Sequence, residues 1–453
     1  MSGGVGTDDY ALARVPEHAR YSWWSVAVQR FGQVSALSQF LLGSTLGFGM
    51  GFWDAFLAFT LGAVILEIVA IGVGIIGCKE GLNTSVLARW TGFGQGGSAL
   101  IGIAIGVSLV GWFGVQSGVS AEGLVSLIGG LPVWAWSLVF GLAVTMIVLW
   151  GFGSMQWVAY LTVPAFLALV CWSIGSVLLG HDLGALMNGP PPGPALSMVE
   201  ATTLVAGGFI VGAIITPDMT RFNRTPADVV KQTVVGFTLG QWLIGMSGVL
   251  LAHAIRSDDI IMIVTSSVGW IGTLIIILGT LKINDWNLYS AGLGVVNFAG
   301  TVLGRTVNRP LATFALGVVG SLLAAGGILD QFTGFLSLLG IVFPPIAGIM
   351  VAEYFVVRRW RGELEAARGR GELPPTSPTW VPATLLIWLV SVLVGALVEV
   401  GLPSVNSIVL AFVLYVVAGK AGLVRGVGVS QTELPQRGTG PATATTGSET
   451  VQS

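Results

Sequence analysis

Long uninterrupted runs of apolar residues constrain the fold of this chain more than any other feature. They lie at 55–76, 138–150, 158–179 and 385–398. A helix needs about 20 predominantly apolar residues to cross the hydrocarbon core of a bilayer. A membrane β-barrel would instead show segments of about ten residues with alternating polarity. The runs therefore predict an all-α integral membrane protein, and a composition with 53% hydrophobic and 9% charged residues agrees with this.

A hydropathy window of about 19 residues predicts about twelve transmembrane helices. Their expected bounds are 25–50, 54–77, 97–128, 132–152, 157–179, 197–217, 232–254, 265–298, 311–328, 331–356, 380–399 and 403–420. The chain is expected to comprise an N-terminal cytoplasmic segment (1–24), a first group of five spans (25–179), a second group of five (197–356), two further spans (380–420) and a disordered cytoplasmic tail (421–453). Because residues 1–22 contain no apolar stretch, no cleavable signal peptide is expected.

The distribution of positive charge predicts the orientation. With the N-terminus in the cytoplasm, eighteen of the 20 Lys and Arg residues fall on the cytoplasmic side. Arg256 falls outside and Lys282 lies within a span. Since cytoplasmic loops carry the excess of Lys and Arg, both termini are expected in the cytoplasm of a plasma or inner membrane. A net charge of −2 indicates no nucleic-acid partner; membrane lipid is the expected environment, and we expect a monomer.

Two spans carry glycine-rich stretches. The first contains "FLLGSTLGFGMG" (Phe40–Gly51), and the sixth contains "VAGGFIVGAIITP" (Val205–Pro217). Interruptions at matching places in two halves of a chain indicate a transporter built from inverted repeats, whose broken helices expose backbone groups to a substrate. The sequence thus predicts a five-plus-five inverted repeat with helices 1 and 6 broken and two helices appended. Glycines also permit close helix packing, and the sequence leaves this alternative open for each span.

Six stretches, taken together and in this order, resemble the nucleobase:cation symporter family 1, and within it most of all the cytosine permease branch. They are "SWWSVAVQRFG", "LGSTLGFGMGFWDAF", "GCKEGLNTSVLAR", "VGWFGVQ", "GGFIVGAIITPDMTRF" and "NDWNLYSAGLGVVN", which cover roughly residues 22–310. The resemblance implies the LeuT-type five-plus-five fold, alternating access between the two sides of the membrane, and import of a small nucleobase-like ring by a secondary transporter.

The third span supplies a candidate substrate site. Trp112 and Gln116 are four residues apart and therefore share one face of a helix. The amide of Gln116 both donates and accepts hydrogen bonds, as the mixed edge of a pyrimidine or purine requires. The resemblance implies that Trp112 stacks on one face of the ligand and Phe209 covers the other. It also implies that bare backbone at Gly207 and Gly208 approaches the ring edge.

The eighth span carries a polar cluster. Asn284, Asp285 and Asn287 would cost several kcal/mol if they faced lipid, so we expect them to face the interior of the bundle. The resemblance implies that one of the two asparagines binds the ligand edge, and we favour Asn284. Asp285 belongs either to a coupling site or to a structural hydrogen bond. Glu67, midway along the second span, has the same two interpretations, as an ion-pair or proton-carrying group or as a structural residue.

Lys282 departs from the family pattern. In sodium-coupled members, hydroxyl side chains directly before the "ND" pair join carbonyls of the first and eighth spans to hold the ion. Here those positions are Lys282 and Ile283. An ammonium among the carbonyls near Gly32, Ser35 and Gly279 would take the place of the cation, and a buried lysine readily loses its proton. We therefore expect proton coupling, with sodium coupling and a lysine extending from the helix end as the alternatives.

The remaining function classes find little support. The chain has three histidines and two cysteines, with no metal-ligand cluster, no nucleophile motif and no signalling domain. We therefore predict a transporter that is not an enzyme and uses neither a cofactor nor a metal. An amino-acid transporter of the same fold is the alternative, but an amino acid requires recognition of its charges rather than ring stacking.

Overall fold

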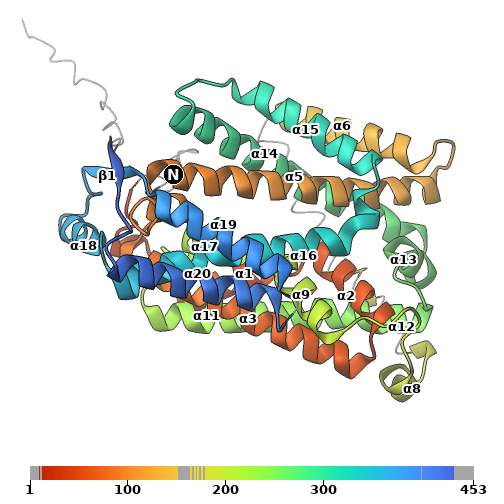
Figure 1. Cartoon of the computed structure of the whole chain (residues 1–453). Helices are drawn as coiled ribbons and strands as arrows, with labels where there is room; N and C mark the ends of the chain where they lie inside the picture. The colour runs from red at the N-terminus through yellow and green to blue at the C-terminus, as the bar shows by residue number, and fades with distance from the viewer. Residues whose placement is uncertain are drawn as a thin grey trace, which may run out of the picture.

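The fold is a bundle of helices, most of which run along one common direction (Figure 1). The computed structural model describes residues 10, 13–150, 164–165, 168–169, 171–172, 175–176, 179–398 and 400–432. Short helices and a small sheet close the two ends of the bundle. The helix α18 and the strand β1 lie at one end, and α8 and α13 lie at the other (Figure 1).

The elements have the following bounds. In the first half they are η1 Glu17–Ala19, α1 Trp23–Val34, α2 Leu37–Gly49, α3 Phe52–Glu80, α4 Thr84–Ala88, α5 Gly94–Leu127, α6 Val133–Trp150, α8 Leu183–Asn188, α9 Met198–Ile214 and α10 Pro217–Thr220. In the second half they are α11 Pro226–Gly240, η2 Gln241–Gly245, α12 Met246–Ile255, α13 Ile260–Val268, α14 Trp270–Val302, α15 Arg309–Ala325, η3 Ile328–Gln331, α16 Phe332–Val342, α17 Pro344–Val351, η4 Ala352–Val357, α18 Arg361–Gly369, β1 Thr376–Trp380, α19 Pro382–Leu397, α20 Pro403–Lys420 and β2 Val427–Gln431.

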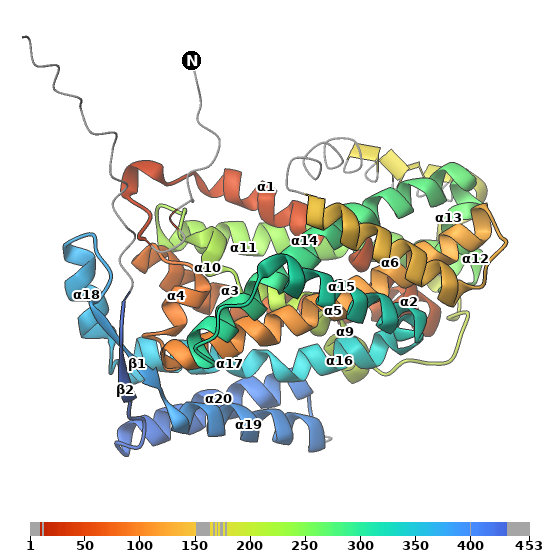
Figure 2. The same cartoon turned by 90° about the horizontal axis from the view of Figure 1, so that it is seen from above.

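Helices occupy eleven of the twelve expected spans, while most of the fifth (157–179) lies outside the described residues. Among the described residues, five helical segments are long and apolar enough to cross a membrane: Phe52–Glu80, Gly94–Leu127, Pro226–Ile255, Ile328–Val357 and Pro403–Lys420. Shorter apolar helices lie between them. The last two helices, α19 and α20, pack against each other along one flank of the bundle (Figure 2). The expectation of appended C-terminal helices agrees with this position.

The first span is broken, but not at its glycines. α1 ends at Val34, α2 begins at Leu37, and Ala36 between them is extended with φ −119° and ψ 165°. The amide of Ala36 donates to the carbonyl of Val34 at 2.8 Å. The carbonyl of Gly32, four residues before Ala36, is thereby left without its helical donor. The break thus exposes backbone oxygen, as a discontinuous transporter helix requires.

The glycines of the first span serve close packing instead. α2 continues unbroken through Gly43 and Gly47. A Cβ added at Gly43 would clash with the carbonyl oxygen of Gly245, and one added at Gly47 would lie 2.6 Å from the Cα of Val249. Glycine at these positions lets the backbones of α2 and the span formed by η2 and α12 approach closely. The expected interruption at Phe40–Gly51 is therefore wrong in place.

The sixth span shows the same correction. α9 runs through Gly207 and Gly208 and ends at Ile214, and the short α10 begins at Pro217. A Cβ at Gly207 would clash with the carbonyl oxygen of Leu336 on α16. The double glycine is therefore a packing site and not a break, because the helical hydrogen bonds continue across it.

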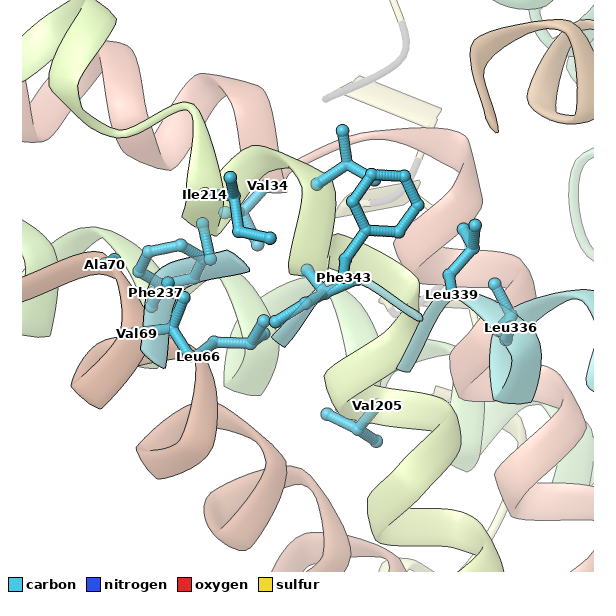
Figure 3. Close-up of a cluster of buried hydrophobic side chains, with 14 of the residues drawn as sticks. Val34, Leu66, Val69, Ala70, Val205, Ile214, Phe237, Leu336, Leu339 and Phe343 are labelled. Atoms are coloured by element: carbon cyan, nitrogen blue, oxygen red, sulfur yellow. The ribbon is translucent and has the colours of Figure 1, made fainter. Parts of the chain in front are cut away.

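A buried apolar core surrounds α9. Val34 at the end of α1 and Ile214 at the end of α9 lie close together, with Phe237 of α11 and Leu66 of α3 nearby (Figure 3). Leu336 of α16 belongs to the same core. The core thus joins the break in the first span to the end of α9.

Two local features differ from the expectations. Gly269, with φ +77°, separates α13 from α14, so the expected eighth span at 265–298 combines the end of one helix with another. The expected disordered tail also contains structure, because β2 pairs antiparallel with β1 in a register that places Thr376 opposite Gln431. Local composition does not reveal β2, since its backbone partners come from a distant segment. Residues 433–453 lie outside the described part of the chain.

Candidate functional site

Trp112 and Gln116 lie on α5, the helix that packs most extensively along α14. Both are buried, with exposed fractions of 8% and 5%. The carbonyl oxygen Oε1 of Gln116 is buried and has no hydrogen-bond partner within the described structure. A buried polar atom without a partner costs about 1–3 kcal/mol. Oε1 of Gln116 is thus a buried acceptor that no described residue pairs.

The indole of Trp112 packs against two aromatic rings of α16. Its ring centroid lies 6.1 Å from that of Phe332 and 5.4 Å from that of Phe335, at interplanar angles of 71° and 79°. Both arrangements are edge-to-face, a favourable geometry for aromatic pairs. The sequence analysis did not identify these two phenylalanines. The available signal was the three-residue spacing in "FTGF", which places them on one helix face.

Phe209 has a different neighbourhood. Its ring packs edge-to-face on Phe237 of α11, with centroids 5.5 Å apart. Gly208 faces α2, because a Cβ added there would lie 3.1 Å from Leu42 Cδ2. Among the described ring contacts, none joins Phe209 to Trp112. Stacking of a ligand between these two rings therefore stays a prediction.

The asparagines of the eighth span face the interior, as expected. Asn284 is fully buried, and its Nδ2 donates to the carbonyl of Phe113 at 3.2 Å and to Ser117 Oγ at 3.0 Å. These acceptors lie on the same turns of α5 as Trp112 and Gln116. Asn287 Nδ2 donates to Asn284 Oδ1 at 3.4 Å. The amide of Asn284 therefore joins α14 to α5 beside the candidate substrate site.

The residues of the predicted coupling site divide into two groups. The first lies at the break in the first span, where the carbonyl of Gly32 lacks its helical donor and the buried hydroxyl of Ser35 has no hydrogen-bond partner among the described residues. The second lies on α14, where Lys282 Nζ is 3.6 Å from Asp285 Oδ1. Gly279 has open space around it, since an added Cβ would meet nothing within 4 Å.

The two groups are not linked by polar contacts. Within the described residues, no hydrogen bond or ion pair joins Lys282 to the first span. The side chain of Lys282 is 22% exposed and that of Asp285 is 2% exposed. Lys282 therefore has a carboxylate partner on its own helix, one turn away. Its placement among the carbonyls near Gly32 and Ser35 stays a prediction.

Glu67 is held by a hydrogen bond. Thr238 Oγ1 of α11 donates to Glu67 Oε1 at 2.7 Å. This contact agrees with the structural interpretation of Glu67, because it links the second and seventh spans.

The helical bundle is similar to solved structures of one fold. Over 94% of this chain and 100% of the other, the fold matches the inward-facing conformation of Mhp1 with a TM-score of 0.75 at 19% identity. It also matches Mhp1, a nucleobase-cation-symport-1 family transporter, in a closed conformation with bromovinylhydantoin bound, with a TM-score of 0.70, 20% identity, and coverage of 91% and 95%. The chain thus has the same predominantly helical fold as Mhp1, the LeuT-type fold.

Sequence comparison gives the family. Residues 14–422 match the family of permeases for cytosine/purines, uracil, thiamine and allantoin. The chain is 31% identical over 356 residues to the cytosine permease of Escherichia coli (strain K12), covering 78% of this chain and 82% of the relative. It is 26% identical over 369 residues to the hydantoin permease of Microbacterium maritypicum, covering 75% and 72%. The chain therefore belongs to the nucleobase:cation symporter family 1.

Family membership confirms the expected class of function. The protein is a permease of nucleobase-like compounds and a secondary transporter, not an enzyme.

Proposed function

We propose that this protein imports a cytosine- or purine-like base and binds it at Trp112 and Gln116. The buried, unpaired Oε1 of Gln116, one helical turn from an aromatic ring, carries the proposal. A heteroaromatic base offers a ring face on which Trp112 would stack. It also offers an edge N–H that would donate a hydrogen bond to Oε1 of Gln116. Asn284, which the sequence analysis favours, already donates to Phe113 and Ser117, so we propose that its neighbour Asn287 reaches the same edge from α14.

The proposed direction of transport rests on charge. Basic residues of the N-terminal segment, α3 and α18 meet at one end of the bundle, where Arg14 and Arg368 both contact Glu80. We assign this end to the cytoplasm because Lys and Arg accumulate on that side of membrane proteins. Both termini then lie in the cytoplasm, and the chain crosses the membrane an even number of times.

The proposed coupling is to protons. Sodium requires a cage of oxygen ligands, and a lysine ammonium within a few ångströms repels a second cation. We expect Lys282 to take the place of the cation, and Asp285 offers a carboxylate at 3.6 Å for proton exchange with it. The lysine would lose and regain a proton during each transport cycle, which makes uptake depend on the proton gradient.

Uptake by proteoliposomes tests the substrate. The purified protein would be offered labelled cytosine, adenine, uracil, a hydantoin and a thiamine-precursor pyrimidine. Saturable uptake of one base, abolished by Gln116→Ala and by an excess of the same unlabelled base, is expected. Uptake of none of these compounds, or uptake of amino acids instead, would overturn the proposal.

Ion gradients test the coupling in the same vesicles. An inward proton gradient should stimulate uptake, and an inward sodium gradient at equal pH should not. Lys282→Thr, which restores a hydroxyl, is expected to lose the proton response. Lys420→Thr, at the end of α20, is the matched lysine control and should retain it. Strong, saturable sodium stimulation in both the native protein and Lys282→Ala would show that Lys282 lies off the cation site.

A further inference from the structure

A polar cavity lies at the end of the bundle that carries α18. None of its lining residues belongs to the candidate substrate site. Its volume is about 600 Å³, within the range of small-molecule sites. The N-terminal segment, the end of α3, the start of α11, η4 and α18 form its walls. Figure 2 shows α18 with β1 and β2 at this end, beside α4 and α10. Its charged lining residues are Arg14, Arg20, Lys79, Arg224, Arg361, Arg368, Glu17, Glu80 and Glu365.

The cavity has an excess of positive charge. Six basic and three acidic side chains line it. Internal pairs already occupy two of the carboxylates. Glu80, which is buried, contacts Arg14 at 2.8 Å and Arg368 at 2.9 Å, and accepts a hydrogen bond from Tyr354 at 2.5 Å. A second pair, at 2.8 Å, joins Glu365 to its neighbour one turn away on α18.

Three cations have no carboxylate partner among the described residues. Arg20 donates through Nη1 to the carbonyls of Cys78 and Asn223, and its buried Nε has no hydrogen-bond partner. Lys79 has only a ring contact, with its Nζ 5.8 Å from the centroid of Phe355. Arg224 is exposed and makes no hydrogen bond or ion pair within the described structure.

Nearby carboxylates do not neutralise these cations. Asp218 accepts hydrogen bonds from the amide and hydroxyl of Thr84, at 2.7 and 2.8 Å. Asp228 forms the capping box of α11 with Thr225. Neither forms an ion pair with Arg20, Lys79 or Arg224. Glu17, the third carboxylate of the lining, is exposed and forms no ion pair within the described structure either. The charge of the three basic groups therefore remains available to a ligand.

We propose that this cavity binds a phosphate-bearing ligand. Guanidinium groups match the oxygens of a phosphate through paired N–H donors, and a lysine adds a compact positive charge. Arg20, Lys79 and Arg224 come from the N-terminal segment, the end of α3 and the loop before α11, and all three line this one cavity, so a ligand that fills it contacts three separate elements. A phosphate monoester or anhydride fits better than a carboxylate, because it offers more charge and more oxygens to a site with three free cations.

A binding experiment on the full chain tests the site without measuring transport. The protein in detergent would be titrated calorimetrically with pyrophosphate and ADP, and with acetate as a carboxylate control. Pyrophosphate and ADP should bind, and acetate should bind at least about tenfold more weakly. The double variant Arg224→Gln/Lys79→Gln should bind both phosphates at least about tenfold more weakly. Neither residue makes a hydrogen bond or ion pair within the described structure, so the double variant is expected to fold.

Arg425→Gln is the matched control, because Arg425 is exposed on the same end and does not line the cavity. A second arm separates a lipid headgroup from a soluble ligand by comparing thermal unfolding in nanodiscs of phosphatidylcholine with and without phosphatidic acid. Stabilisation by phosphatidic acid in the native protein but not in the double variant supports a lipid source. Absence of an effect in both arms, or equal weakening by Arg425→Gln, overturns the proposal.

Discussion

At the scale of single residues, Trp112 has two separate contributions, one to packing and one to the proposed ligand. Its edge-to-face contacts with Phe332 and Phe335 fix the orientation of the indole. Trp112→Ala removes the stacking surface, which for a base on an aromatic ring is worth about 1–3 kcal/mol. We expect base affinity to fall by about 5- to 150-fold, measured by equilibrium binding.

Two controls accompany this variant. Trp112→Phe keeps a ring and should retain most of the affinity. Trp270→Ala removes a tryptophan that is 63% exposed on the outside of the bundle and should leave affinity unchanged. Unchanged affinity in a folded Trp112→Ala protein would remove Trp112 from the site.

Substitution of the two asparagines of α14 is expected to affect stability and uptake to different extents. Asn284→Ala removes two hydrogen bonds between α14 and α5, so it should lower both the unfolding temperature and uptake. The loss of stability should be about 1–3 kcal/mol, because acceptors on α5 are left unpaired. Asn287→Ala should lower uptake with a smaller loss of stability, because Asn287 makes one long bond. Thermal unfolding and uptake of both variants check this, and equal destabilisation would contradict it.

At the scale of elements, glycines set the distance between helices. Gly43→Ala places a methyl group against the carbonyl of Gly245, where backbone and not a flexible side chain has to move. Overpacking of this kind costs about 1–3 kcal/mol, and we expect a lower unfolding temperature. A normal unfolding temperature would show that α2 and η2 are less tightly packed than described.

Gly334→Ala is the matched control for the same substitution on α16. A Cβ there meets nothing within 4 Å. Because alanine is about 1 kcal/mol more favourable than glycine inside a helix, this variant should be as stable as the native protein or more so.

At the scale of the whole molecule, Glu80 joins three segments that are distant in the sequence. Its carboxylate, at the end of α3, accepts from Arg14, Tyr354 and Arg368, which lie in the N-terminal segment, η4 and α18. Burial lowers the pKa of Arg14, partly opposed by Glu80, so the guanidinium is desolvated and depends on that partner. Glu80→Ala leaves this guanidinium without a carboxylate partner, with only backbone carbonyls to accept its hydrogen bonds, at a cost of about 3–5 kcal/mol.

Limited proteolysis and thermal unfolding measure this effect. We expect Glu80→Ala to unfold at a lower temperature and to be cut faster in the N-terminal segment and α18. Glu365→Ala, which breaks only the exposed ion pair with Arg361, should behave like the native protein. Equal behaviour of the two variants would argue against Glu80 as the link between these segments.

The sequence by itself determined the membrane class, the positions of most spans, the family, and the facing of Trp112 and Gln116. These depend on local quantities: the length of an apolar run, the spacing of residues on one helix, and motifs in a fixed order. The inward facing of Asn284 and Asn287 was also predictable, because lipid excludes unpaired amides.

Only the tertiary structure decided where the helices break and what the glycines do. The break at Ser35–Ala36 carries no glycine, and α2 and α9 continue through Gly43 and Gly207 because other helices pack there. The aromatic partners of Trp112 and the pairing of β2 with β1 likewise come from distant segments. Such features depend on which helix surfaces pack together in three dimensions. A short segment of sequence does not reveal which distant segment packs against it.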